Sequence, residues 1–189
     1  MNKISIDLTW KLNDDVLLPG KYSNKHEIRF NDQICIKGDA APDWHGDKEN
    51  SNPEQTLAAS LSSCHMMTFL ALAAKMKWPV SSYTDNAIAT LGKNSKGKMS
   101  VTCIELNPKI KFTNNFSVDT LKMKEVQERA HRYCFIANSL SEEVIVKSDL
   151  MILGVSDPDG GTEGDITTNY EARAIELYAV NDIPDLSKY

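Results

Sequence analysis

Two cysteine-containing segments carry the residue types that could do chemistry in this chain. Cys64 lies in the apolar stretch NPEQTLAASLSSCHMMTFLALAAKM (residues 52–76) and is followed directly by His65. Cys134 lies in AHRYCFIANSL (residues 130–140), and His131 stands three residues before it. A cysteine in an apolar helix is most often a small buried hydrophobe. Each cysteine nevertheless has a histidine within three residues and is predicted to face the core. The alternative is therefore that the cysteines have a redox, catalytic or metal-binding role.

The composition is that of an ordinary globular protein with one hydrophobic core. Of its 189 residues, 41% are hydrophobic and 25% are charged. The formal net charge of −5 argues against a nucleic-acid partner, because phosphate binding requires a basic face. Lysine and arginine are scattered along the chain, which also argues against a membrane surface as partner.

The sequence predicts a cytoplasmic protein with reduced cysteines. Residues 1–15 contain no apolar segment of signal-peptide length. The apolar run of the first predicted helix is about half of the ~20 residues that a membrane span needs. In a reducing compartment a structural disulfide framework is not expected. Cys35 and Cys103 alternate with isoleucine and valine in strand patterns, so we predict that they pack in the core.

The first half of the chain predicts strands followed by a helix. Residues 3–10 alternate as in a half-buried strand, and residues 26–38 form two such runs separated by Asn31-Asp32, which predicts a hairpin. Residues 39–51 are a polar connector. Asn52 suits the N-cap and Pro53 the first turn of a helix that should end near residue 77, before Trp78-Pro79.

The second half repeats this order. Residues 81–93 and 99–113 predict two or three strands, and residues 114–140 predict a second helix. Strands are predicted again at 142–147 and 170–180. The pattern indicates an α+β fold, with two long central helices packed on antiparallel sheet, in a single domain spanning residues 1–189. The apolar stripe expected on the second helix consists of Val118, Leu121, Val126, Ala130 and Cys134.

These segments resemble the OsmC/Ohr family of thiol-dependent peroxidases. The resemblance rests on residues 52–76, on SYTDNA (residues 82–87) and on AHRYCFIANSLSEEVIVK (residues 130–147), and it covers roughly residues 20–148. It implies an intertwined homodimer with two sites at the interface. The strand-rich start has little of its own to bury, which also favours pairing with a second chain. Residues 149–189 would be a C-terminal extension.

The resemblance also implies a role for each site residue. Cys64 would be the peroxidatic thiol, Cys134 the resolving thiol and Glu54 the acidic partner of a catalytic arginine. A thiolate attacks the O–O bond of an organic hydroperoxide and becomes a sulfenic acid, which then condenses with the second thiol. A dithiol or thioredoxin-like reductant would reopen the disulfide. No cofactor is implied.

The cation of this site is the point at which the sequence departs from the family. In YSNKHEIRF (residues 22–30) the position of a family arginine holds Asn24. Arg29 is the only arginine before the first predicted helix, so we expect it to approach Cys64 from the same or the partner chain, with Lys25 as second choice. The alternating pattern of Ile28 and Phe30 nevertheless places Arg29 on the opposite strand face.

Two other functions remain open. Cys64-His65 and His131-x-x-Cys134 together supply two thiolates and two imidazoles that could bind a metal ion. However, adjacent residues diverge by about 100° on a helix, so Cys64 and His65 can hardly reach one ion. A non-enzymatic relative that binds a small apolar molecule is the second alternative. The loop DPDGGTEGD (residues 157–165) lacks the glutamate and flanking helices of an EF-hand.

Overall fold

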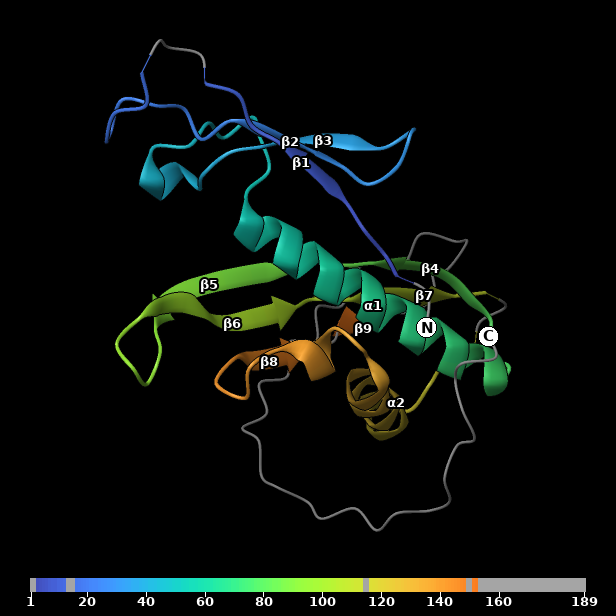
Figure 1. The fold of residues 1–189 in the computed structure, drawn as a ribbon. Helices are drawn as coiled ribbons and strands as arrows, with labels where there is room; N and C mark the ends of the chain where they lie inside the picture. Colours follow the sequence, from blue (N-terminus) through green and yellow to red (C-terminus); the bar gives the residue numbers. More distant parts are fainter. Residues whose placement is uncertain (1–2, 13–15, 114–115, 149–150, 153–189) are drawn as a thin grey trace, which may run out of the picture. The chain divides into compact units, whose positions relative to one another are not determined.

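The computed structural model describes residues 3–12, 16–113, 116–148 and 151–152 (Figure 1). The chain divides into two compact units, residues 1–157 and 158–189, and every described residue belongs to the first. The loop at 157–165 and the strand predicted at 170–180 lie outside the described residues. Both α-helices and β-sheets are present, so the predicted α+β class is confirmed.

The N-terminal strands form a three-stranded antiparallel sheet. It consists of β1 (Asp7–Thr9), β2 (His26–Arg29) and β3 (Cys35–Gly38), in the order β1-β2-β3. The predicted hairpin is confirmed: Asn31 Oδ1 accepts hydrogen bonds of 2.9 Å from the backbone N–H groups of Gln33 and Ile34. This Asx turn sets the register of β2 on β3.

Helix α1 (Pro53–Lys75) begins where the sequence predicted. Asn52 accepts a hydrogen bond from the Gln55 backbone N–H, and the Gln55 side chain accepts one from the Asn52 backbone N–H. This capping box satisfies two N–H groups that lack helical partners. Lys77, with φ of 58°, and the following Trp78-Pro79 end the helix. In the described part of the chain α1 is the one helix long and apolar enough to cross a membrane, a property that core helices of soluble proteins share.

Two further sheets lie beneath α1, and each predicted strand run contributes to both. Figure 1 shows α1 lying across these strands. The run at 81–93 divides at Asp85 into β4 (Val80–Thr84) and β5 (Ile88–Lys93), and the run at 99–113 divides at Pro108 into β6 (Met99–Leu106) and β7 (Lys109–Phe112). The sheet orders are β4-β7-β9 and β5-β6-β8, with β8 at Ile145–Ser148 and β9 at Met151–Ile152.

The sheets are not antiparallel throughout, which corrects the prediction. β4–β7 and β5–β6 are antiparallel, but β8 pairs with β6 and β9 pairs with β7 in parallel. Parallel neighbours need a long crossover connection, and here β7, helix α2 (Thr120–Tyr133) and the 3-10 turn η2 (Ala137–Ser139) stand between β6 and β8.

Helix α2 is shorter than predicted. It begins at Thr120 because Asp119 caps it, accepting hydrogen bonds from the backbone N–H groups of Leu121 and Lys122. It ends at Tyr133, so Cys134 is the C-cap residue with extended backbone rather than a residue within the helix. The predicted stripe was wrong at Leu121, which is 78% exposed. The buried residues of α2 are Met123, Val126, Gln127 and Ala130.

Candidate functional site

Cys64 and Cys134 lie together in the core between α1 and the end of α2. Cys134 is fully buried in a cluster with Leu61, Ile104 and Leu106, and the half-buried Cys64 packs against this cluster. α1 packs on α2 as well as on β5 and β6, which closes the cluster from several sides. The structure therefore places the two cysteines next to each other, although they are 70 residues apart in the chain.

The two thiols lie close enough to interact and are not equivalent. Burial, and then the proximity of Cys64, raise the pKa of the Cys134 thiol to about 11. The backbone N–H of Ala137 donates to Cys134 Sγ at 3.4 Å, which acts in the opposite direction. Cys134 is therefore protonated at neutral pH, while Cys64 is the member of the pair that retains solvent access.

Glu54 is not needed as a helix cap. The capping box at the start of α1 is made by Asn52 and Gln55, so the Glu54 carboxylate makes neither of these hydrogen bonds. Its Oε2 atom is buried and has no hydrogen-bond partner among the described residues. A buried carboxylate oxygen without a partner is costly, so this position calls for a donor or a cation.

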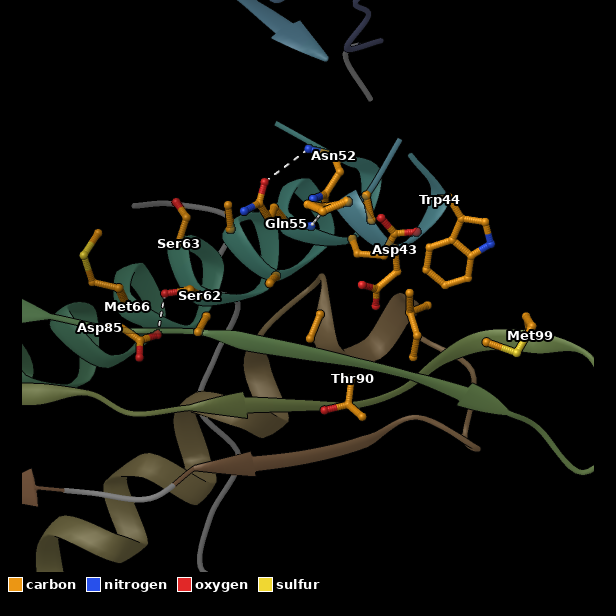
Figure 2. A pocket seen from close by; sticks show the side chains of 18 of the residues that line it. Asp43, Trp44, Asn52, Gln55, Ser62, Ser63, Met66, Asp85, Thr90 and Met99 are labelled. Carbon is orange, nitrogen blue, oxygen red and sulfur yellow. Dashed lines mark hydrogen bonds between the residues drawn. The ribbon is translucent and has the colours of Figure 1, made fainter. Parts of the chain in front are cut away.

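An open pocket of about 1020 Å³ lies beside this carboxylate (Figure 2). It is bounded by the 3-10 turn η1 (Pro42–Trp44), α1, β4 and β5. Figure 2 shows Asp43 and Trp44 near its one end and Ser63 and Met66 near the other. The acidic residues in its lining are Asp43, Glu54 and Asp85, and the described lining contains no lysine, arginine or histidine.

Small residues separate this pocket from the cysteines. Ala58, Ala87 and Ala89 line the pocket and also belong to the packing of the cluster that contains Cys134. Cys64 is not part of the described lining, but Ser62 and Ser63, the two residues before it, are.

Sequence reasoning missed the polar groups opposite α1. Ser62 donates a hydrogen bond to Asp85 at 2.5 Å, and the other Asp85 oxygen accepts from the backbone N–H of Asn107 at 2.7 Å. The Tyr83 hydroxyl is buried, has no hydrogen-bond partner among the described residues, and has its pKa raised by burial and by Asp85. Tyr83 and Asp85 lie within the SYTDNA segment, which was the available signal.

His65 has a different environment from its neighbour Cys64. It is fully buried, and its Nε2 is hydrogen-bonded to Oε1 of Gln127 on α2. Burial lowers the pKa of His65 below its ordinary value, and the Gln127 hydrogen bond only partly offsets this. Gln127 had not been singled out from the sequence, because one glutamine in a charged helix gives no signal.

The predicted cations lie elsewhere in this chain. Arg29 is on the exposed face of β2, directly between Asp7 of β1 and Cys35 of β3. Lys25 pairs with Asp47 at 2.7 Å, which raises the pKa of Lys25 and lowers that of Asp47. Among the described contacts, none joins either residue to Cys64 or Glu54.

The remaining cysteines and histidines do not gather into a metal site in the described part of the chain, where no group of three or more His, Cys, Asp or Glu side chains could hold an ion. Cys64 faces Cys134 while His65 faces Gln127, as the divergence of adjacent helical residues predicts. The core placement predicted for Cys35 was wrong: it is exposed, because it shares the polar sheet face with Arg29. Cys103 is half-buried.

Comparison with known proteins agrees with the fold. The family model described as OsmC-like protein matches residues 46–149. An OsmC-like protein of unknown function from Vibrio cholerae is 38% identical, with a TM-score of 0.72, and the match covers 78% of this chain and 99% of that one. No curated protein matches the chain.

Two organic hydroperoxide resistance proteins show the same fold at lower identity. The structure from Elizabethkingia anophelis is 18% identical with a TM-score of 0.63, covering 81% of this chain and 98% of that one. The structure from Bacillus subtilis is 19% identical with a TM-score of 0.58, covering 78% and 98%. Since the family model spans more than half of the chain and the Vibrio cholerae structure matches at 38% identity, the chain belongs to the OsmC-like family.

Proposed function

We propose that this protein is a thiol-dependent peroxidase that reduces organic hydroperoxides to alcohols through Cys64 and Cys134. The observation that carries the proposal is the contact between these two thiols, one half-buried and one fully buried. Two organic hydroperoxide resistance proteins share the fold, which supports this choice of substrate class.

The proposed reaction has three steps: attack on the peroxide, disulfide formation and reduction of the disulfide. The Cys64 thiolate attacks one peroxide oxygen, the O–O bond breaks, and the alkoxide takes a proton and leaves as an alcohol. The resulting Cys64 sulfenic acid condenses with the Cys134 thiol, forming the disulfide and releasing water. A dithiol or thioredoxin-like reductant then exchanges with the disulfide, restores both thiols and is itself oxidised.

The environments of the two thiols support the order in which we propose that they react. Cys64 keeps solvent access, so a peroxide can reach it. Cys134 is fully buried, and its raised pKa keeps it protonated until a sulfenic acid forms beside it. Cys64 is therefore the attacking thiol and Cys134 the resolving one.

Activation of Cys64 requires a cation, and we assign to Glu54 the role of holding one. Its buried Oε2 has no partner among the described residues, so an arginine or lysine from outside this part of the protomer can pair with it. We assign this role to Arg29 of the partner subunit, because Arg29 within one protomer is exposed on the N-terminal sheet.

A homodimer would also cover apolar surface that this chain leaves open. Leu8, Ile28 and Ile36 lie in register across β1, β2 and β3, and Leu8 is 59% exposed. Ile4 and Ile34 in the same part of the chain are 97% and 51% exposed. Burying this face against a second copy is worth roughly 25 cal/mol per Å² of apolar surface.

We also propose that the protein is cytoplasmic and has no nucleic-acid partner. The net charge of −5 favours no nucleic-acid partner, and the four free cysteines suit a reducing cytoplasm.

The proposal is tested by mass spectrometry after one equivalent of an organic hydroperoxide is added to the reduced protein. We expect peptide mapping to find Cys64 joined to Cys134 and the peroxide converted to alcohol. Cys64→Ser should abolish consumption of the peroxide, Cys134→Ser should stop at a sulfenic acid on Cys64, and Cys103→Ser should behave as wild type. An unreacted Cys64 in the wild-type protein would contradict the proposal.

A second candidate function is the binding of a small molecule without catalysis. The observation that favours it is the open pocket beside Glu54. Glu54 Oε2 and the Tyr83 hydroxyl are buried polar atoms without described partners in its lining, and Asp43 and Trp44 border it. A bound molecule with a cationic or donor group would satisfy them. Under this alternative, hydroperoxide leaves all four thiols free, so the same experiment separates the two functions.

A further inference from the structure

One polar pair lies in the middle of the otherwise apolar interface between α1 and α2. His65 and Gln127 have exposed fractions of 0% and 5%. The other residues of the buried stripe on α1 are Ala58, Leu61, Phe69, Leu72 and Ala73. The corresponding residues on α2 are Met123, Val126 and Ala130.

The pair makes one hydrogen bond and leaves two buried atoms without a described partner. Gln127 Oε1 can only accept, so His65 Nε2 carries the proton in this arrangement. His65 Nδ1 and Gln127 Nε2 are buried and have no hydrogen-bond partner among the described residues. A well-packed apolar pair in these positions would be at least as stabilising, so stability alone does not explain the pair.

We propose that the His65–Gln127 pair fixes the register of α1 on α2 and thereby positions Cys64 for disulfide formation with Cys134. His65 is adjacent to Cys64 in α1, and Gln127 stands seven residues, or two helical turns, before Cys134. Any slide of α1 along α2 therefore moves both contacts together. The part of this inference that concerns catalysis rests on the proposed peroxidase function.

The size of a one-turn slide shows why the register matters. Apolar stripes of similar side chains can pack in neighbouring registers that differ by about 5.4 Å, one helical turn. A disulfide forms only when its Cα atoms are about 4.4–6.8 Å apart, so a slide of that size would prevent closure. In the neighbouring register His65 and Gln127 would face apolar groups and lose their hydrogen bond, which disfavours it. A buried polar pair is known to select register in this way between paired helices.

His65 acts in this account as a positioning residue for the disulfide step. Its ring is hydrogen-bonded to Gln127 of α2, whereas Cys64, the preceding residue, diverges from it by about 100° around α1 and interacts with Cys134. The expected consequence of losing the pair is slower closure, with the attack of peroxide on Cys64 retained.

The test compares variants by the rate at which diamide, an oxidant of paired thiols, closes the disulfide. Diamide takes the two hydrogens of the thiols and is reduced to a hydrazine, so this readout does not require peroxidase activity. The variants are His65→Leu/Gln127→Met, which removes both polar groups, and Gln127→Met, which removes one with little change of volume. Leu72→Ala, in the same stripe of α1, is the control that weakens packing but keeps the pair. Exchange of the pair, His65→Gln/Gln127→His, is the rescue.

We expect closure, measured by peptide mapping, to slow on the order of 10- to 100-fold in both variants that remove the hydrogen bond. The Leu72→Ala control and the exchanged pair should close at a rate near that of wild type. Closure at the wild-type rate in a folded Gln127→Met protein, or equal slowing in Leu72→Ala, would overturn the inference. Failure of the peroxidase proposal would appear differently, as a wild-type protein that closes with diamide but leaves hydroperoxide unreduced.

Discussion

Ser62 on α1 donates a hydrogen bond to Asp85, the residue at which the chain passes from one sheet to the next. The second carboxylate oxygen of Asp85 accepts the backbone N–H of Asn107, in the corresponding link between β6 and β7. The half-buried Asp85 side chain therefore connects α1 with the β4–β5 link and with the β6–β7 link. It fixes how α1 lies over β4 and β5, and so where Cys64 stands.

Asp85→Ala should destabilise the protein strongly for this reason. The substitution leaves the Ser62 hydroxyl and the Asn107 N–H without their acceptor, and we expect the free energy of unfolding in urea to fall by about 3 kcal/mol. Asp119→Ala, which removes the N-cap of α2, is the comparison and should cost about 1 kcal/mol. A smaller loss in Asp85→Ala than in Asp119→Ala would contradict the joining role of Asp85.

Glu54→Gln should separate activity from stability. Without the carboxylate the cation is not held near Cys64, and we expect kcat/KM for an organic hydroperoxide to fall about 100-fold. The free energy of unfolding should change little by comparison, because Oε2 of Glu54 has no hydrogen-bond partner among the described residues of its own protomer. Glu49→Gln, an exposed glutamate before α1, should change neither quantity. Loss of stability with full activity would instead mark Glu54 as structural.

The N-terminal sheet should hold the protomers together. We expect the wild-type protein to be a dimer by light scattering at micromolar concentration. Ile28→Lys, in the apolar row of β2, should give monomers, since a buried unpaired ammonium group is costly. Glu128→Lys places a lysine on the exposed face of α2, away from this sheet, and should remain dimeric. A wild-type monomer would remove the dimer from the proposal.

The buried histidine should make stability depend on pH below 6.5. Burial lowers the pKa of His65 in the native state, whereas in the unfolded chain it titrates near 6.5. Above pH 6.5 the ring is neutral in both states and its contribution is constant. As pH falls below 6.5 the unfolded chain binds a proton that the native state does not, so the free energy of unfolding decreases towards the lowered native pKa.

Urea denaturation at a series of pH values measures this decrease, and His65→Leu/Gln127→Met should show a smaller slope below pH 6.5. Burial also lowers the pKa of His131, so His131→Gln is needed to subtract that contribution. An unchanged slope in the double variant would mean that His65 binds its proton in the same pH range in the native and the unfolded state.

Several features of this protein follow from residues close together in the chain. The start of α1 depends on Asn52 and Gln55, and its end on Lys77 and Trp78-Pro79. The hairpin between β2 and β3 depends on Asn31 and its two following N–H groups. Such contacts span only a few residues, so the sequence predicts them directly. The cysteine segments are equally local, which is why the family resemblance could be recognised.

Other features depend on packing between distant segments. The period of the second helix allowed Leu121 in the buried stripe, but α1 covers the side on which Met123 and Gln127 lie. Cys35 fits a core strand pattern, yet its side of the N-terminal sheet is exposed.

The sequence by itself determined two helices, the strands around them, and the cysteine segments that indicate the family. The pairing of Cys64 with Cys134 was expected from the family resemblance, and the structure brings the two residues together. Only the tertiary structure decided that His65 meets Gln127 and that Glu54 is left with a buried oxygen. The physical reason is that hydrogen-bonded turns and caps are short-range and nearly independent of the rest of the chain. Contacts between helices and sheets arise instead from how apolar faces far apart in the chain are buried together, as for His65 and Gln127 or Cys64 and Cys134.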